Sequence, residues 1–132
     1  MGRLILILIF SMMLLNVGCQ SKQLVNNDKL VVLKRSGTEN KYEKHKEITD
    51  KKTVLAIKSV LKKGEDWKKS KISMTMPPEY KFYFEPTDGS EALSVWYNVW
   101  FTNEFAEVYI EASNLYKQFS VEDSLALRAV IQ

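Results

Sequence analysis

The 132-residue sequence has little of what most catalytic and metal sites require. It contains one cysteine, Cys19, and one histidine, His45, which stands among charged residues in "YEKHKE". A Ser-His-acid triad or a His-ligated metal site would therefore lack its usual members. A single cysteine also excludes an internal disulfide. We expect a protein that is not an enzyme and has no metal site and no cofactor, with His45 at a solvated surface position.

Glycine and proline are also scarce. The five glycines are scattered singly, which excludes a phosphate-cradling loop. Two of the three prolines are adjacent, and Pro77-Pro78 excludes a helix there because each ring fixes its own backbone and restrains the preceding residue. An acidic cluster follows at Glu85, Asp88 and Glu91, but it lacks the ligand spacing of a calcium loop, and Asp88-Gly89 is the signal of a hairpin.

No apolar run in the sequence is long enough to predict a membrane-spanning helix. The longest extends over twelve residues, Leu4 to Leu15, whereas a spanning helix needs about 20. Arg3 precedes this run and small residues follow it up to Cys19, which is the order of a secretory signal. An uncleaved transmembrane anchor is the alternative interpretation.

The end of this signal, "LNVGC", resembles the lipobox of bacterial lipoproteins, with Gly18 and Cys19 flanking the cleavage site and Asn16 where an aliphatic residue is usual. The resemblance implies that signal peptidase II removes residues 1–18. It also implies that a diacylglyceryl transferase modifies Cys19, which carries S-diacylglycerol and a possible N-acyl group. Two acyl chains suffice for stable membrane attachment. Residues 19–29 then form a lipidated N-terminus and polar tether, and residues 30–132 a single domain on the extracytoplasmic face of the cell membrane.

Charge is unevenly distributed along the chain. Residues 22–81 contain sixteen basic and eight acidic side chains, whereas residues 82–132 contain two and eight. A basic half next to the anchor would suit an anionic lipid surface. The interpretation that we favour is a solvated face whose charges are offset once the strands interleave. Lysine-rich stretches such as "KKGEDWKKSK" could suggest nucleic acid as a partner, but the extracytoplasmic compartment argues against it.

Apolar periodicity and turn residues predict an α+β fold. We expect strands over residues 30–36, 40–48, 80–86, 92–104, 105–113 and 115–119, and helices over 49–64 and 120–132. Thr49 or Asp50 can cap the first helix, and Ser120 with Asp123 forms a capping box for the second. Because consecutive strands separate the helices, the order predicts a mostly antiparallel sheet of four to six strands with two helices packed on one face.

Strict alternation in "ALSVWYNVWFTNE", residues 92–104, assigns the two faces of this sheet. The helix-covered face is predicted to carry the aliphatic and phenylalanine side chains of Leu93, Val95, Val99, Phe101, Val108, Ile110, Phe82 and Phe84. The opposite face is predicted to carry Trp96, Asn98, Trp100, Phe105, Glu107, Tyr109, Glu111 and Tyr83.

The aromatic residues of this opposite face are the candidate binding site. Trp96 and Trp100 should lie about 13 Å apart along one strand, with Tyr109 between or beside them. Aromatic rings interspersed with Asn and Glu are a platform for a glycan, peptide or protein partner. The alternative, which we weigh more heavily, is that these rings cover an otherwise bare sheet by packing across strands. A one-residue slip or a bulge would instead turn them inward.

Several segments together resemble a family of small lipoproteins. With the lipobox, the stretches "EITDKKTVLAIKSVLKK", "MPPEYKFYF", "LSVWYNVWFT" and "YKQFSVEDSLALRAVI" are similar to the YhfM-like lipoproteins of Gram-positive bacilli, over residues 30–131. The resemblance implies location and fold, and carries over only Cys19 as a functional residue. We expect a non-enzymatic binding module at the cell envelope. The alternative is an inhibitor or small hydrolase-like factor acting on a wall or membrane component.

Overall fold

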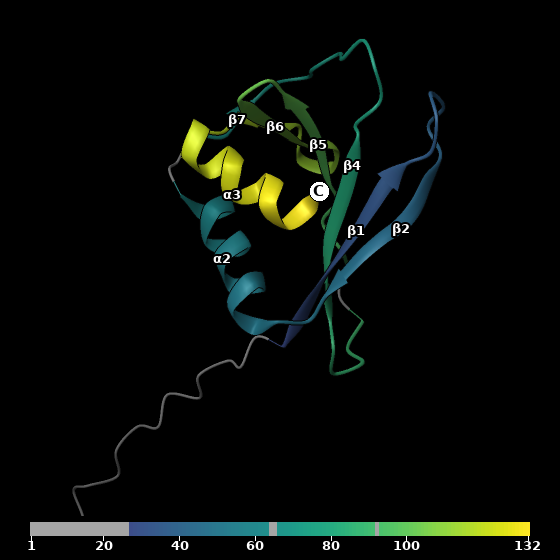
Figure 1. Ribbon diagram of the computed structural model, residues 1–132, viewed down its shortest axis with the longest axis vertical. Coiled ribbons are helices and arrows are strands. Elements are labelled where there is room, and N and C mark those ends of the chain that lie inside the picture. The colour runs from purple at the N-terminus through teal and green to yellow at the C-terminus, as the bar shows by residue number, and fades with distance from the viewer. Residues whose placement is uncertain (1–26, 64–65, 92) are drawn as a thin grey trace, which may run out of the picture.

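The computed structural model describes residues 27–63, 66–91 and 93–132 (Figure 1). The predicted signal peptide, Cys19 and most of the predicted tether lie outside the described residues. The strands are β1 (Asp28–Arg35), β2 (Tyr42–Ile48), β3 (Lys68–Lys69), β4 (Tyr80–Pro86), β5 (Tyr97–Thr102), β6 (Phe105–Ile110) and β7 (Leu115–Gln118). The helices are α2 (Lys51–Lys62), α3 (Val121–Ile131) and a short 3-10 turn, η2 (Glu111–Ser113).

These strands form one antiparallel sheet in the order β2-β1-β4-β5-β6-β7-β3. Both α-helices lie on the same side of it, with α3 over β6 and α2 towards β1 (Figure 1). The predicted α+β fold with two helices on one face is confirmed. The sheet has seven strands instead of four to six because the two-residue β3 pairs with β7.

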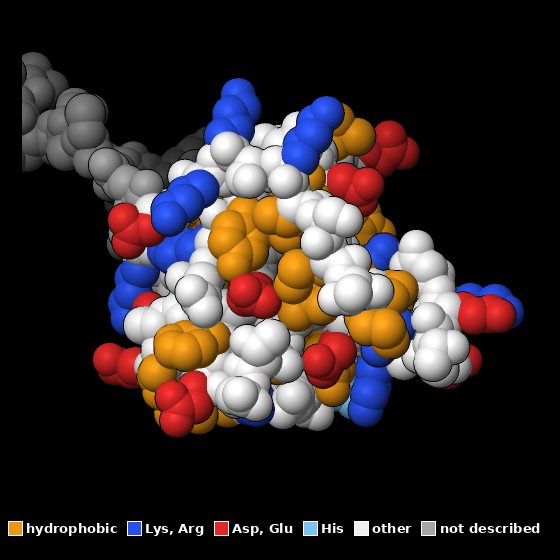
Figure 2. Space-filling view, turned by 90° about the horizontal axis from the view of Figure 1, so that it is seen from above, with side chains coloured by type: hydrophobic (Ala, Val, Ile, Leu, Met, Phe, Trp, Pro, Cys, Tyr) orange, Lys and Arg blue, Asp and Glu red, His pale blue; other side chains and the backbone are white. Residues whose placement is uncertain are grey.

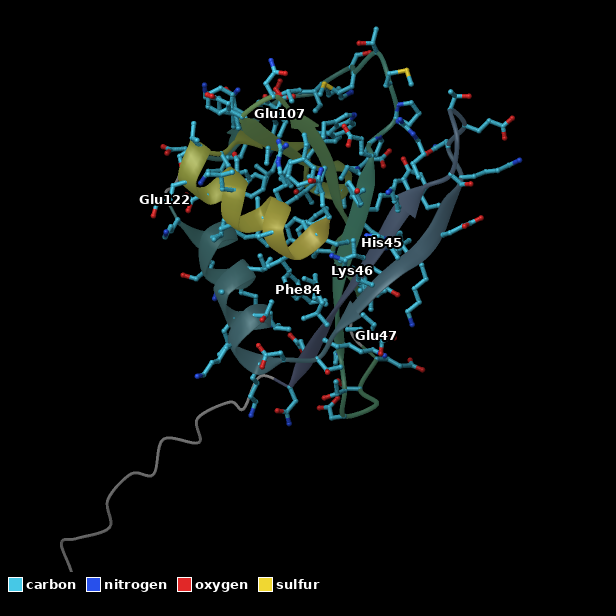
Figure 3. All side chains as sticks on the ribbon, viewed as in Figure 1. His45, Lys46, Glu47, Phe84, Glu107 and Glu122 are labelled. Carbon is cyan, nitrogen blue, oxygen red and sulfur yellow. The ribbon has the colours of Figure 1, made fainter. Side chains whose placement is uncertain are left out.

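The hydrophobic core lies between the helices and the sheet. It is formed by alternate strand residues and by the apolar stripe of each helix, so that Phe82, Val99 and Val108 are completely buried. Phe84 lies under the helices at the same face and packs against Phe82 with the ring centroids 6.0 Å apart (Figure 3). Full burial of one such side chain stabilises the fold by about 1.5–3 kcal/mol.

Short-range caps define where the helices begin, as the sequence predicts. The Asp50 carboxylate accepts hydrogen bonds from the Thr53 hydroxyl at 2.7 Å and the Thr53 amide at 3.0 Å, and these bonds lower the pKa of Asp50. Ser120 Oγ accepts from the Asp123 amide at 3.2 Å. The Asp123 carboxylate forms an ion pair with Lys63 at 3.2 Å, which links the two helices, and it does not bond back to the Ser120 amide, so half of the predicted capping box forms.

Basic side chains of the strands contact the carboxyl ends of both helices. Lys117 is only 7% exposed and donates to the carbonyl of Lys63, the residue that ends α2. Lys46 donates to the Val130 carbonyl at 3.4 Å, and His45 Nε2 lies 3.2 Å from the Gln132 carbonyl oxygen. A helix end carries unpaired carbonyls and partial negative charge, so these contacts fix each helix against the sheet.

The start of β5 corrects the predicted strand over residues 92–104. The strand begins only at Tyr97; Leu93 is 101% and Val95 46% exposed, so neither contributes to the helix-covered face. The reason is that β4 and β5 pair only between Tyr80–Phe82 and Tyr97–Val99, and residues 87–91 and 93–96 belong to no strand, whereas the sequence predicts a tight hairpin at Asp88-Gly89. Residues 83–86 of β4 pair with β1 and not with β5.

In α3, the residues that are buried are not simply the apolar ones. Val121 and Leu125 are exposed, whereas Ser124, Leu127 and Ile131 are buried. Ser124 Oγ accepts from the Ala106 amide of β6 at 2.7 Å and lies 3.3 Å from the Phe119 carbonyl, to which it can donate. A polar residue thus occupies a core position because it satisfies two backbone groups there.

We expect Ser124→Ala to lower the free energy of unfolding by about 1–3 kcal/mol, because it leaves the buried Ala106 amide without an acceptor. Urea unfolding monitored by tryptophan fluorescence measures this loss. Ser113→Ala, at an exposed position in η2, is the control and should change stability little. Equal stabilities of the two variants would contradict the role given to Ser124.

Candidate functional site

One row of side chains crosses the open face of the sheet, the face opposite the helices. Strand register aligns Lys81 of β4 with Asn98 of β5, Asn98 with Tyr109 of β6, and Tyr109 with Tyr116 of β7. Because Val99 and Val108 point into the core, their neighbours Asn98 and Tyr109 point away from it. The predicted placement of Asn98, Trp100 and Tyr109 on this face is confirmed.

The segment between β3 and β4 lies against this face and is fixed by three strands. Three consecutive carbonyls accept side-chain donors: Met76 from Trp100 Nε1 at 2.9 Å, Pro77 from Arg35 of β1, and Pro78 from the Tyr42 hydroxyl of β2 at 2.8 Å. Prolines have no amide hydrogen, so this segment cannot pair as a regular strand. Alternation places Trp100 on the open face, and its indole N–H holds this segment there.

Two adjoining hollows result, and together we call them the trough. The first, of about 430 Å³, lies between residues 72–78 and the strands, and is lined by Trp100 and Tyr109. The second, of about 340 Å³, is lined by Trp96 and by Ser94 and Ala112. The two hollows meet where they share the side chains of Lys81, Asn98 and Glu111.

All three predicted site residues line the trough, but from different positions. Trp100 and Tyr109 lie in the first hollow, and the Tyr109 hydroxyl donates to Asn114 Oδ1 at 2.8 Å. Trp96 lies in the second hollow, before β5 begins, and is 42% exposed. Its ring rests against Tyr83 with a centroid distance of 4.5 Å. The expected spacing of the two tryptophans along one strand is therefore wrong, because Trp96 belongs to the preceding loop.

Asn98 is the residue whose importance the sequence did not indicate. It is only 6% exposed, and its side-chain amide makes no hydrogen bond to any other residue in the described part of the chain, yet it lines both hollows. Alternation places Asn98 on the open face, but its burial depends on residues 72–78, which come from a distant part of the sequence. Lys81 and Glu111 likewise meet at Asn98 only in the folded chain.

Charged and aromatic groups alternate around the trough. Lys81 lines both hollows, and its ammonium lies 4.3 Å from the centroid of the Tyr42 ring, a cation–π contact with a residue that lines neither hollow. Beyond Tyr109, burial and the Glu107 carboxylate, which accepts the Tyr116 hydroxyl at 2.8 Å, raise the pKa of Tyr116 to about 12. Tyr116 is thus neutral at physiological pH.

Seen from above, at 90° to the view of Figure 1, the surface carries apolar and charged side chains side by side. Apolar side chains lie between acidic and basic ones there, instead of forming one broad apolar patch (Figure 2). Among the described residues, no group of three His, Cys, Asp or Glu side chains is arranged to hold a metal ion. In the same part of the chain, no helix is both long and apolar enough to span a membrane.

A further recess lies on the helix side of the sheet. It has a volume of about 350 Å³ and is mainly apolar, with Leu61, Trp67, Phe84 and Leu115 among its lining residues. Trp67 Nε1 donates to the Leu61 carbonyl at 3.0 Å, and its ring meets Phe119 edge-on. This recess is where the two short helices leave the core incompletely covered.

No family model, no curated protein and no solved structure matches this chain.

We expect Trp100→Phe to lower the free energy of unfolding by about 1–2 kcal/mol, because the Met76 carbonyl loses its indole donor. Trp96→Phe is the matched control, because Trp96 is exposed and its indole N–H bonds no other described residue. It should change the free energy of unfolding by less than about 0.5 kcal/mol. Chemical denaturation compares the two variants. A larger loss for Trp96→Phe would contradict the anchoring role of Trp100.

Proposed function

We propose that this chain is a lipid-anchored, non-enzymatic binding protein on the extracytoplasmic face of the cell membrane, and a YhfM-like lipoprotein. The lipobox-like "LNVGC" supports the anchor, with Cys19 as the acylated residue. The trough supports the binding role, and the observation that carries it is the Asn98 amide, which has no hydrogen-bond partner among the described residues and is reached by solvent where the two hollows meet.

An amide that the described part of the chain leaves without a hydrogen-bond partner, and that solvent reaches in the trough, is free to bond a ligand. Asn98 lies at the junction of two open hollows that each have an aromatic side chain in the wall, so a ligand there would contact rings as well as form hydrogen bonds. A concave site with a few convergent polar groups is typical of ligand binding. The trough therefore supports binding better than it supports packing alone.

The chemistry around the trough supports binding without catalysis. His45 lines neither hollow, and its ring lies beside Tyr80 at 5.8 Å and near the carboxyl end of α3. The charged groups at the junction are one ammonium, Lys81, and one exposed carboxylate, Glu111. Such groups orient a ligand, and a hydrolytic mechanism would call for a nucleophile and base within hydrogen-bond reach of each other.

For the anchor, we expect Cys19→Ala to abolish acylation and cleavage before residue 19, because the thiol is the site of attachment. Metabolic labelling with a fatty-acid probe and mass spectrometry of the N-terminus measure both. Ser21→Ala is the control and should be labelled like the parent chain. Equal labelling of the Cys19→Ala chain would show that the anchor is elsewhere.

For the trough, we expect Trp96→Ser to reduce retention of the detergent-solubilised chain on the detergent-insoluble envelope fraction at least several-fold while the thermal midpoint stays unchanged. Detergent is needed because the lipid anchor would otherwise hold every variant on the membrane. Phe105→Ser is the matched control, because Phe105 is a comparably exposed aromatic residue that does not line the trough. Co-sedimentation measures retention. If both variants, or neither, lost retention with the fold intact, binding through the trough would be contradicted.

A further inference from the structure

The Asn98 amide, which solvent reaches in the trough, specifies what kind of group a ligand should present. A primary amide offers two donors and one acceptor oxygen, so it can bond either the C=O or the N–H of a secondary amide of a ligand. The N–H and C=O of a trans amide point in opposite directions, and Asn98 would therefore bond one of them. Asn98 is only 6% exposed at the point shared by both hollows, so a ligand that bonds it would lie within the trough.

The two charged groups at the same point narrow the choice further. Lys81 can only donate hydrogen bonds, and the carboxylate of Glu111 can only accept them. A hydroxyl group does both, so a ring bearing several hydroxyls can serve Lys81 and Glu111 at once. The opposite charges also favour a ligand without net charge at this junction.

The aromatic walls suit the apolar faces of such a ring. The polar atoms of Trp100 and Tyr109 are already bonded within the protein, to Met76 and Asn114, so that these residues offer ring surface to a ligand. Trp96 offers the corresponding surface in the second hollow, where Tyr83 supports it. Because each hollow has an aromatic residue in its wall and the two meet at Asn98, they could receive two successive rings of one ligand.

A peptide fits the trough less well. Strand addition requires an unpaired sheet edge, whereas β5, β6 and the Lys81 end of β4 are paired on both sides where they line the trough. A proline-rich peptide could lie on aromatic rings, but its backbone offers carbonyl acceptors and few donors. Such a peptide would leave the Glu111 carboxylate unpaired.

We propose that the trough binds a glycan built from N-acetylated amino sugars, with two successive rings in the two hollows and one acetamido group hydrogen-bonded to Asn98. This inference rests on the proposed binding function and adds the class of ligand. Lys81 and Glu111 take the hydroxyls beside that group, and Trp96, Trp100 and Tyr109 contact the ring faces.

Titration calorimetry of the full-length acylated chain in nanodiscs tests the proposal with two soluble oligosaccharides. Chitotetraose carries acetamido groups, and cellotetraose has the same backbone with hydroxyls in their place. We expect chitotetraose to bind at least about tenfold more tightly, because only it presents an amide to Asn98.

Asn98→Leu should remove this preference, because leucine has a similar volume and no hydrogen-bonding groups. Asn27→Leu is the matched control, because Asn27 is an exposed asparagine that lines neither hollow, and it should keep the preference. If Asn98→Leu does not fold, Glu111→Gln at an exposed position is the second variant, and it should weaken both oligosaccharides.

Equal affinity for the two oligosaccharides, or a preference that survives Asn98→Leu, would overturn the proposal. If a proline-rich peptide binds in a Trp96-dependent manner and neither oligosaccharide does, the glycan is wrong and the binding function stands. If nothing binds and envelope retention is also independent of Trp96, both are wrong.

Discussion

Burial of one face of a seven-stranded sheet under two short helices is the constraint on which the rest of this structure depends. The core between them contains the completely buried Phe82, Val99 and Val108, whose burial supplies the main stabilisation. The helices stay on this face because their apolar stripes pack on the sheet and because strand side chains hold their ends. Lys117 contacts the carboxyl end of α2, and Lys46 contacts that of α3. Each of these lysines belongs to a strand, so the sheet itself positions the helices.

With both helices on one side, the segment between β3 and β4 lies over the other face of the sheet, and Trp96 packs on Tyr83 beside it. This segment carries Pro77-Pro78 and is held by side chains of β1, β2 and β5. A regular strand would pair through its backbone, whereas this segment leaves a hollow in which Asn98 meets solvent. The trough exists because the segment between β3 and β4 is irregular. It keeps its shape because side chains of three different strands hold that segment.

Local signals in the sequence predicted the parts of the fold that depend on neighbouring residues. Alternation identified Val99 and Val108 as core residues, and short-range caps identified Asp50 and Ser120 as helix starts. Residues whose environment comes from distant segments were not predictable in this way. Leu93 and Val95 alternate like strand residues but have no pairing partner.

The aromatic residues show how far the same reasoning extends to the site. Their placement on the open face follows from strand alternation, but their roles follow from tertiary contacts. Trp100 is bonded to a carbonyl 24 residues earlier, whereas Trp96 is exposed in a loop and bears no such constraint. Packing and binding are thus not alternatives for this face, because the bond that makes Trp100 structural also fixes its ring as a wall of the trough. A wall that is fixed before a ligand arrives loses little entropy on binding, so the bond that positions Trp100 would favour the binding that we propose at Asn98.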